Sequence, residues 1–359
     1  MEDDDEPSKS VIHARTGNKT TMKIPRLAVI ISCWNYERYV AQAIRSVASQ
    51  AHEDCELIVV DDGSTDASWA VIQREGVRCY RTKNNGSRSA CLYGLSRTHA
   101  PFVLFLDADD ELEPGAIDTI IENLDEGVAK LQFPLTRIDQ SGEVISGPVP
   151  KLGAFRDRHL TESVLRTGVY MSPPTSGNVF RRDLCSLLEE VDYEQTVDGV
   201  ILVAAPFWGD VVSLSKPLGR YRIHDRNDSG LGRLPDAALL RREISRFVDR
   251  MAHLSKILAR SGAGLKLVPA EQTYFYLERS FYLAIAEGRR ASAADAIRLI
   301  WRLWAGYHSI NAKVEFTCFL LLTAVLPNRR ARQSIAYRLD AGERSVRGFL
   351  QAVFASGPR

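Results

Sequence analysis

Short apolar runs alternate with amphipathic segments through the first part of the chain. The runs at 27–33, 56–60, 77–81 and 102–106 have the length and composition of buried strands. The segments between them repeat apolar residues every three or four positions, which is typical of helices that pack through one face. Strands of about five residues that alternate with longer helices predict an α/β fold, with a mostly parallel sheet flanked by helices.

The region after Pro114 departs from this simple alternation. We expect a helix over 115–124 and then one strand over 129–139, followed by a turn at Gln140-Ser141-Gly142 and a short return strand. A strand, a tight polar turn and a second strand form the pattern of a hairpin. The sequence therefore predicts a hairpin appended to the parallel sheet.

The last third of the chain has a helical pattern. Apolar residues recur at three- and four-residue spacing from Leu240 to Leu258, which predicts one long amphipathic helix. Further helices are expected near 271–287, 292–305 and 313–326. The sequence thus predicts a helical segment that follows the α/β domain.

Charge divides the chain at about the same place. The net charge is +1, but residues 1–229 sum to roughly −10 and residues 230–359 to roughly +11. The first 24 residues are acidic and polar, with no apolar core of a secretory signal. We therefore expect a disordered tail at 1–24, an α/β domain at 25–230 and a basic helical domain at 231–359.

The cysteines indicate a reducing compartment. None of the six has the CxxC spacing of a zinc site, and several lie inside apolar runs, so a disulfide framework is not indicated. Together with the missing secretory signal, this predicts a cytoplasmic protein. The six are Cys33, Cys55, Cys79, Cys91, Cys185 and Cys318.

Three polar clusters directly follow predicted strands, where ligands of open α/β sheets bind. They are Ser32-Cys33-Trp34-Asn35, Asp61-Asp62-Gly63-Ser64 and Asp107-Ala108-Asp109-Asp110. Asp107 and Asp109 offer hard oxygen ligands with which Mg²⁺ or Mn²⁺ could bridge to a diphosphate. The alternative for this cluster is a solvated acidic turn that caps the next helix.

The first two clusters suggest contacts to a nucleotide-sugar. Asp62 could accept from a ribose hydroxyl or a nucleobase N–H, as acidic residues at strand ends do in dinucleotide-binding folds, although the same residues also suit a tight turn. Trp34 could cover a base or sugar face, or belong to the core. Ser32 stands in the same cluster and is a further candidate contact.

Taken together, these motifs resemble a known family. The runs AVIISCWNYERYVAQAIRSVASQ, ELIVVDDGSTD and FVLFLDADDELEPGAI resemble, in order, spacing and strand context, the family 2 glycosyltransferases of the GT-A fold. This resemblance covers about residues 25–125. A second stretch, formed by PPTSGNVFRRDL (173–184), Asp198-Gly199 and residues 209–229, is similar to the distal half of non-processive bacterial members.

The resemblance implies an activity and roles for individual residues. It implies a GT-A, Rossmann-like catalytic domain in which Asp62 contacts the nucleoside, Asp109 is the principal metal ligand with Asp107 beside it, and Asp198 is the general base. It further implies inverting, metal-dependent transfer from a nucleoside-diphosphate sugar, expected to be UDP-linked. The acceptor would be a saccharide or a lipid-linked glycan in bacterial surface polysaccharide synthesis.

The chain departs from the family pattern before the DxD strand. Many members carry Ala-Arg-Asn-x-Gly there, whereas this chain has Cys91 and Leu92 at the arginine and asparagine positions. Arg88, one helical turn earlier, is the candidate substitute for the donor contact. The processive-synthase signature QxxRW is absent from the region after Asp198, which disfavours a polymerising synthase.

The segment GRYRIH adds three further candidates. Arg220 and Arg222 could approach a pyrophosphate, because guanidinium groups match phosphate oxygens, and His224 could be a third metal ligand. The alternative is a pair of surface strand charges and a loop histidine.

Two other functions compete with the transferase. A nucleotidyltransferase would normally carry a glycine-rich loop with a lysine near the first strand, which SCWNYERYV lacks. A catalytically silent nucleotide-sugar-binding module would differ only at Asp198. Nucleic-acid binding is disfavoured, because the basic residues are spread through helices without a recognised module.

The apolar segment 314–326 has two interpretations. Its roughly 13 residues are too few to span a bilayer, which needs about 20. It could be a buried helix of the C-terminal domain. Alternatively, it could be an interfacial helix that rests on the cytoplasmic face of the inner membrane, helped by Trp301, Trp304 and the cluster Arg329, Arg330 and Arg332. The oligomeric state is left open.

Overall fold

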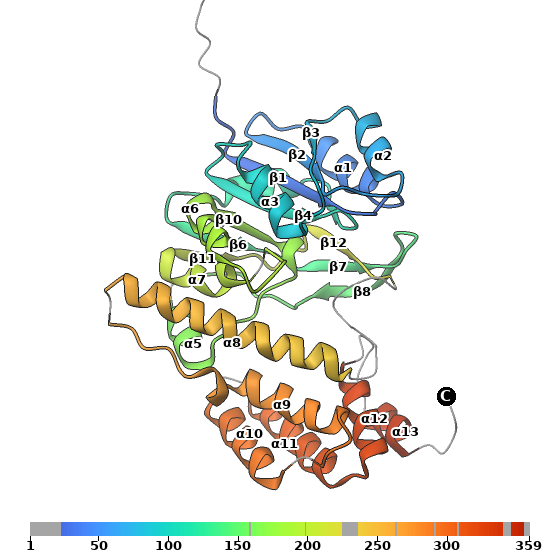
Figure 1. Cartoon of the computed structure of the whole chain (residues 1–359), viewed down its shortest axis with the longest axis vertical. Coiled ribbons are helices and arrows are strands. Elements are labelled where there is room, and N and C mark those ends of the chain that lie inside the picture. Colours follow the sequence, from blue (N-terminus) through green and yellow to red (C-terminus); the bar gives the residue numbers. More distant parts are fainter. Residues whose placement is uncertain are drawn as a thin grey trace, which may run out of the picture.

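The chain folds into an α/β part and a helical part that are joined by one long helix (Figure 1). The computed structural model describes residues 23–157, 159–197, 199–224, 236–262, 264–290, 292–306, 309–339 and 346–354. The predicted tail at 1–24 lies outside the described residues, apart from Lys23 and Ile24.

The central sheet has eight strands in the order β3-β2-β1-β4-β10-β6-β11-β9. The pairs β3–β2, β2–β1, β1–β4 and β6–β11 are parallel, and the other three are antiparallel. This arrangement confirms the predicted α/β class with a largely parallel sheet. The strands are β1 (Leu27–Cys33), β2 (Cys55–Asp61), β3 (Cys79–Arg81), β4 (Phe102–Asp107), β6 (Val128–Gln132), β9 (Phe155–Asp157), β10 (Asn178–Arg181) and β11 (Asp210–Ser213).

A second sheet corrects two predictions. The strand expected over 129–139 is two strands, β6 and β7 (Leu135–Ile138), which belong to different sheets. Pro134 lies at the break, where its missing N–H prevents a continuous ladder. The hairpin of β7 and β8 (Val144–Val149) is therefore not appended to the main sheet. It pairs with β12 (Gly219–Arg222), which in turn pairs with β5 (Glu111–Leu112).

Helices cover both faces of the central sheet, which explains why its strands are continuous apolar runs. Alternate residues of β1 point to opposite faces: Val29 and Ile31 pack with α1 and α4, whereas Ile30 packs on the side of α3, α7 and α8. The helices of this part are α1 (Val40–Ala48), α2 (Ser68–Arg74), α3 (Ser87–Leu95), α4 (Ala116–Glu122), α5 (Leu160–Thr167), α6 (Arg182–Cys185) and α7 (Val200–Trp208).

The C-terminal part is helical, as predicted. Its long helix α8 packs through Leu254 and Leu258 on the α/β core and through Leu240 on the helical cluster. The domain boundary at 230/231 stays a prediction. In the described ranges, no helix combines the length and the apolar content that a bilayer crossing needs. The helices are α8 (Ala237–Arg260), α9 (Tyr274–Ala286), α10 (Ala293–Ala305), α11 (Ile310–Val325), α12 (Asn328–Leu339) and α13 (Val346–Phe354).

Candidate functional site

The three predicted polar clusters meet at one edge of the central sheet. Strand β1 lies between β2 and β4, and in the parallel register Cys33 is opposite Asp61, while Ser32 is opposite Asp107. Neighbouring parallel strands that end at the same level bring the residues after them together, at the edge where α/β sheets bind ligands. The strand ends therefore form the candidate site.

The turns after β1 and β2 are joined to each other by hydrogen bonds. Asn35 has a left-handed backbone (φ 61°), which asparagine tolerates better than most residues. Its side-chain oxygen accepts from the backbone N–H of Thr65 at 2.8 Å, and its own N–H donates to Ser64 Oγ at 2.9 Å. Tyr36 N–H donates to Ser68 Oγ at 2.9 Å. These bonds fix the two turns as one unit.

Ser32 and Trp34 lie at the tip of β1 with different surroundings. The Ser32 hydroxyl is 3.1 Å from the Ser87 hydroxyl at the start of α3. The Trp34 side chain is 50% exposed, so it is not a core residue. An exposed indole at a strand tip can cover a ring of a bound ligand.

Asp62 is buried and organises a neighbouring loop. One carboxylate oxygen accepts from Thr82 Oγ1 at 3.2 Å and Asn85 N–H at 3.1 Å, and the other accepts from Gly86 N–H at 2.8 Å. In this structure the carboxylate thus shapes the loop that leads into α3. Its predicted nucleoside contact stays a prediction, and a ligand would have to share these oxygens.

Arg88 ties the start of α3 to the segment before Asp198. Its guanidinium donates to the carbonyls of Glu194 (3.0 Å) and Leu188 (2.9 Å), and its backbone N–H donates to the carbonyl of Gln195 (2.8 Å). The guanidinium of Arg88 therefore holds residues 188–195 through two of its nitrogens, Nε and Nη1. The predicted donor contact of Arg88 stays a prediction.

Asp198, the predicted base, lies outside the described residues. The residues just before Asp198 are connected to the candidate site by two hydrogen bonds. The Arg88 N–H donates to the Gln195 carbonyl, and the nearby Gly86 N–H donates to the Asp62 carboxylate. Glu194 also forms an ion pair with Arg250 of α8 at 2.6 Å. The segment that leads to Asp198 is thus held against the loop at the strand tips.

Asp109 and His224 come together although 115 positions separate them in the sequence. His224 Nε2 is 2.8 Å from Asp109 Oδ2, and both side chains are buried. The His224 ring stacks on Tyr39, with ring centroids 5.3 Å apart and planes inclined by 21°. The structure therefore places two of the predicted metal ligands in direct contact, with Asp107 two residues away at the end of β4.

A third acid of the same turn is buried and bonded. Asp110 accepts from Ser176 Oγ at 2.6 Å and from the backbone N–H of Arg222 at 2.9 Å, and Ser176 Oγ also accepts from Asp107 N–H at 3.1 Å. Burial raises the pKa of Asp110 well above its usual range, and the charges of Asp109 and Asp107 add to that effect. Ser176 had no predicted role; its only sequence signal is its place in the PPTSGN segment.

Arg222 is buried and holds the acidic turn at 107–110 by hydrogen bonds. It donates to the Asp109 carbonyl at 2.9 Å and the Asp139 carbonyl at 3.1 Å, and its other terminal nitrogen binds the Glu111 carboxylate. Arg220, two residues earlier, pairs with Glu113 at 3.0 Å. The expectation that these arginines approach a pyrophosphate is wrong for Arg222 in this structure, because every guanidinium nitrogen already has a protein acceptor.

Asp109 and His224 suit a cation that takes its remaining ligands from the substrate and from water. Within the described ranges, no group of three or more His, Cys, Asp or Glu side chains is arranged to hold a metal ion. Asp109 and His224 nevertheless present a carboxylate oxygen and an imidazole nitrogen side by side. Mg²⁺ is commonly held by one or two carboxylates together with substrate phosphates and water, so the residues fit a cation that binds with a diphosphate.

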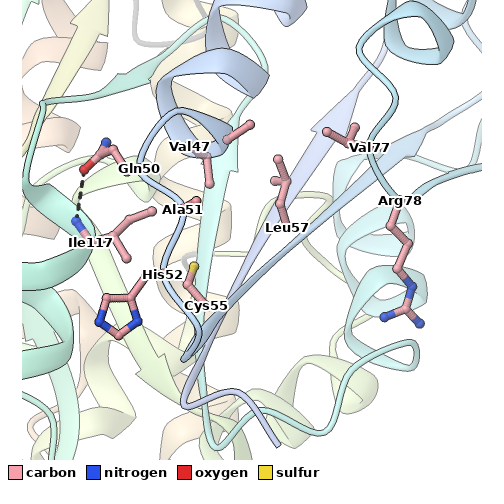
Figure 2. A pocket seen from close by; sticks show the side chains of 10 residues that line it. Val47, Gln50, Ala51, His52, Cys55, Leu57, Val77, Arg78 and Ile117 are labelled. Atoms are coloured by element: carbon pink, nitrogen blue, oxygen red, sulfur yellow. Dashed lines mark hydrogen bonds between the residues drawn. The ribbon is translucent and has the colours of Figure 1, made fainter. Parts of the chain in front are cut away.

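A small cavity of about 180 Å³ lies elsewhere (Figure 2). Its walls include Cys55 and Leu57 at the beginning of β2, together with Val47 and Ala51 near the end of α1. It is therefore at the edge of the sheet opposite the acidic strand tips. Its volume is also below the roughly 300 Å³ at which small-molecule sites begin, so it is not the donor site.

Comparison with known proteins gives the family. Residues 28–188 match the family described as glycosyl transferase family 2. An uncharacterized glycosyltransferase from Nostoc sp. is 34% identical over 217 residues, which are 56% of this chain and 66% of that protein. The GalNAc(5)-diNAcBac-PP-undecaprenol beta-1,3-glucosyltransferase of Campylobacter jejuni is 28% identical over 186 residues, which are 49% of this chain and 57% of that protein.

The matches thus span between half and two thirds of the lengths of these two relatives. Among solved structures, S. aureus TarS 1–349 in complex with UDP-GlcNAc has a TM-score of 0.49 and 16% sequence identity, covering 87% of this chain and 91% of that one. The match at 28–188 contains the three strand-tip clusters that form the candidate site. Residues 28–188 therefore form a domain of glycosyl transferase family 2.

Proposed function

We propose that this protein is a metal-dependent, inverting glycosyltransferase that moves a sugar from a nucleoside-diphosphate sugar, UDP-linked, to a glycan or glycolipid acceptor. The observation that carries the proposal is the meeting of the three clusters at the tips of β1, β2 and β4, with Asp109 in contact with His224. Acidic and imidazole ligands at this edge of an α/β sheet suit the binding of a metal diphosphate.

The cation would be held by Asp109 and His224, with Asp107 beside them, and Mg²⁺ or Mn²⁺ suits this donor set. When bound, such a cation acts as a Lewis acid for the departing nucleoside diphosphate. Arg222 keeps the Asp109 backbone in place, and Tyr39 fixes the plane of the His224 ring. The protein thus orients both ligands before the donor binds.

The other strand-tip residues would bind the nucleotide-sugar. Trp34 is exposed and can cover a base or sugar ring, and Ser32 stands beside it with a hydroxyl. Asp62 contributes by shaping the loop between β3 and α3, and Arg88 by holding residues 188–195 at the start of α3, besides the direct contacts proposed for them.

Asp198 is the proposed general base. The acceptor hydroxyl must lose its proton as it attacks the anomeric carbon, and a positioned carboxylate typically accelerates such a step by about 10²–10⁴-fold. A single displacement with one base inverts the anomeric centre. Arg88 supports this arrangement because it holds residues 188–195, which precede Asp198.

The acceptor and the location are proposed from the name of a relative. The Campylobacter jejuni relative is named for an undecaprenol-linked glycan, which supports a lipid-linked acceptor in bacterial surface polysaccharide synthesis. We propose that the enzyme works in the cytoplasm, at the cytoplasmic face of the inner membrane, where such acceptors are exposed to soluble donors.

A thermal-shift panel of nucleoside diphosphates and nucleotide-sugars, with and without Mn²⁺, tests the donor site. A ligand that binds only the folded protein raises the melting temperature, and we expect a rise with one nucleotide that requires the metal. Asp109→Asn should abolish the metal-dependent rise. Asp118→Asn, an exposed acid on α4, is the matched control and should keep it.

Transfer assays separate binding from catalysis. Asp198→Asn should keep the thermal shift but lower kcat by about 10²–10⁴-fold. Full activity of this variant would refute the base assignment. Wild-type protein that binds donor but transfers to no saccharide or lipid-linked acceptor would instead indicate a silent binding module.

A further inference from the structure

Helix α10 exposes an apolar stripe to solvent. Ile297, Trp301 and Trp304 are 65%, 63% and 47% exposed, and their spacing of four and three places them on one helical face. Leu299 and Leu303 are buried on the opposite side. The helix therefore has two apolar faces, and only one of them packs on the protein.

Helix α11 continues the stripe. Ile310, Val314, Leu321 and Val325 are 48% to 79% exposed and follow a spacing of four, seven and four, which again selects one helical face. In contrast, only Leu320 and Thr323 of this helix are buried. One face of α11 therefore packs on the helical core through Leu320, while the face that carries these four residues stays exposed, so the choice between the two interpretations of 314–326 stays open.

The two stripes lie side by side. Trp304 Nε1 donates to Thr317 Oγ1 at 2.9 Å, and α10 and α11 pack together at the end of the molecule farthest from the central sheet (Figure 1). We refer to the seven exposed residues of α10 and α11 named above as the apolar ridge. Exposed apolar patches of this kind on otherwise polar proteins mark interaction surfaces.

Basic residues border the ridge. Arg298 and Arg302 follow Ile297 and Trp301 on α10, while Arg329 and Arg330 begin α12 just after Val325. Arg298 pairs with Asp295 at 3.8 Å and Arg302 donates to Gln272 Oε1 at 2.9 Å, while the Arg330 guanidinium lies 5.4 Å from the centroid of the Phe354 ring. Residues 292–359 hold ten lysine or arginine residues and four acidic ones.

We propose that the apolar ridge docks on an anionic lipid bilayer, with the ridge in the interface and the bordering arginines at the lipid headgroups. Tryptophan and aliphatic side chains next to arginines match the chemistry of such an interface. A second copy of the chain would bring like charges together and fits the ridge less well. The inference deepens the proposed function, because a lipid-linked acceptor is found at such a surface.

Vesicle sedimentation of the full chain tests the proposal. We expect binding to phosphatidylcholine vesicles that contain phosphatidylglycerol, and weaker binding to phosphatidylcholine alone or at high salt. The double variant Trp301→Gln/Leu321→Gln should lose about tenfold or more in partitioning, because each side chain buries apolar area in the interface. Val144→Gln/Ile145→Gln, on equally exposed positions of β8, should bind as the wild type does.

Other outcomes overturn the proposal. Wild-type protein that ignores both kinds of vesicle, or a ridge variant that sediments like the control, excludes lipid docking. A dimer that the ridge variant converts to monomers in light scattering, without vesicle binding, would assign the ridge to a second copy. The ridge variant should keep the metal-dependent thermal shift with nucleotide, so failure of the donor site is distinguishable from failure of docking.

Discussion

Replacing Arg222 by methionine should destabilise the protein far more than replacing Arg220 by methionine. The Arg222 side chain is 1% exposed and binds Glu111, the Asp109 carbonyl and the Asp139 carbonyl, while its guanidinium lies 4.9 Å from the centroid of the Tyr39 ring. Methionine keeps much of the volume but removes every donor. Glu111 and the two carbonyls then lose their partner in a mostly buried place.

The magnitude follows from burial. Removing one partner of a buried ion pair typically costs about 3–5 kcal/mol, because a charge remains without compensation. Arg220 is the matched control: it lies on the same strand, pairs with Glu113 of the same neighbouring segment and is 35% exposed. Exposed pairs contribute about 0–1 kcal/mol, so Arg220→Met should change the free energy of unfolding by less than about 1 kcal/mol.

Urea unfolding of the wild type and both variants measures the difference. We expect the midpoint to fall strongly for Arg222→Met and little for Arg220→Met, with similar slopes. Arg222→Met should also weaken the metal-dependent thermal shift, since the Asp109 backbone loses its support. Equal losses in the two variants would refute the view that the buried arginine holds the acidic turn.

Three further predictions concern single sites. Asp62→Ala should lower the free energy of unfolding by about 1–3 kcal/mol in urea titration, because the loop donors that it accepts lose their partner; an unchanged midpoint would contradict this. Gly94→Ala should cost about 1–3 kcal/mol, since its Cβ would lie 2.6 Å from a methyl of β1, whereas Gly153→Ala, in open space, should be neutral. At pH 8 a maleimide should label exposed Cys318 and spare buried Cys91. Burial raises the pKa of Cys91 to about 12, so its reactive thiolate forms only at higher pH. Rapid labelling of Cys91 in the folded protein would be inconsistent with the structure.

The buried pair of Glu194 and Arg250 links the helical part to the candidate site. Glu194 is bonded through its carbonyl to Arg88 and through its carboxylate to Arg250 of α8. Gly199 leaves no room for a side chain beside this carboxylate, because a Cβ would lie 2.0 Å from it. The helical part therefore contacts the segment that contains the proposed base.

The local sequence determined most of the elements. The strands β1, β2 and β4 and the helices from α8 to α11 were predicted close to their observed positions, because apolar periodicity is a property of neighbouring residues. The clusters at the strand tips were also predicted, since the carboxyl ends of adjacent parallel strands must meet. The sequence could not place the break at Pro134 between two sheets, because a strand's partners are set by distant segments.

Only the tertiary structure decided which side chains meet and which faces stay exposed. Asp109 and His224 are separated by 115 positions, and Asn35 reaches the second turn only because β1 and β2 pair. The exposure of α11 is equally non-local: an apolar helix is buried or exposed according to the neighbours that cover it. Periodicity fixes which face of an element is apolar, whereas packing of the whole chain fixes what that face contacts.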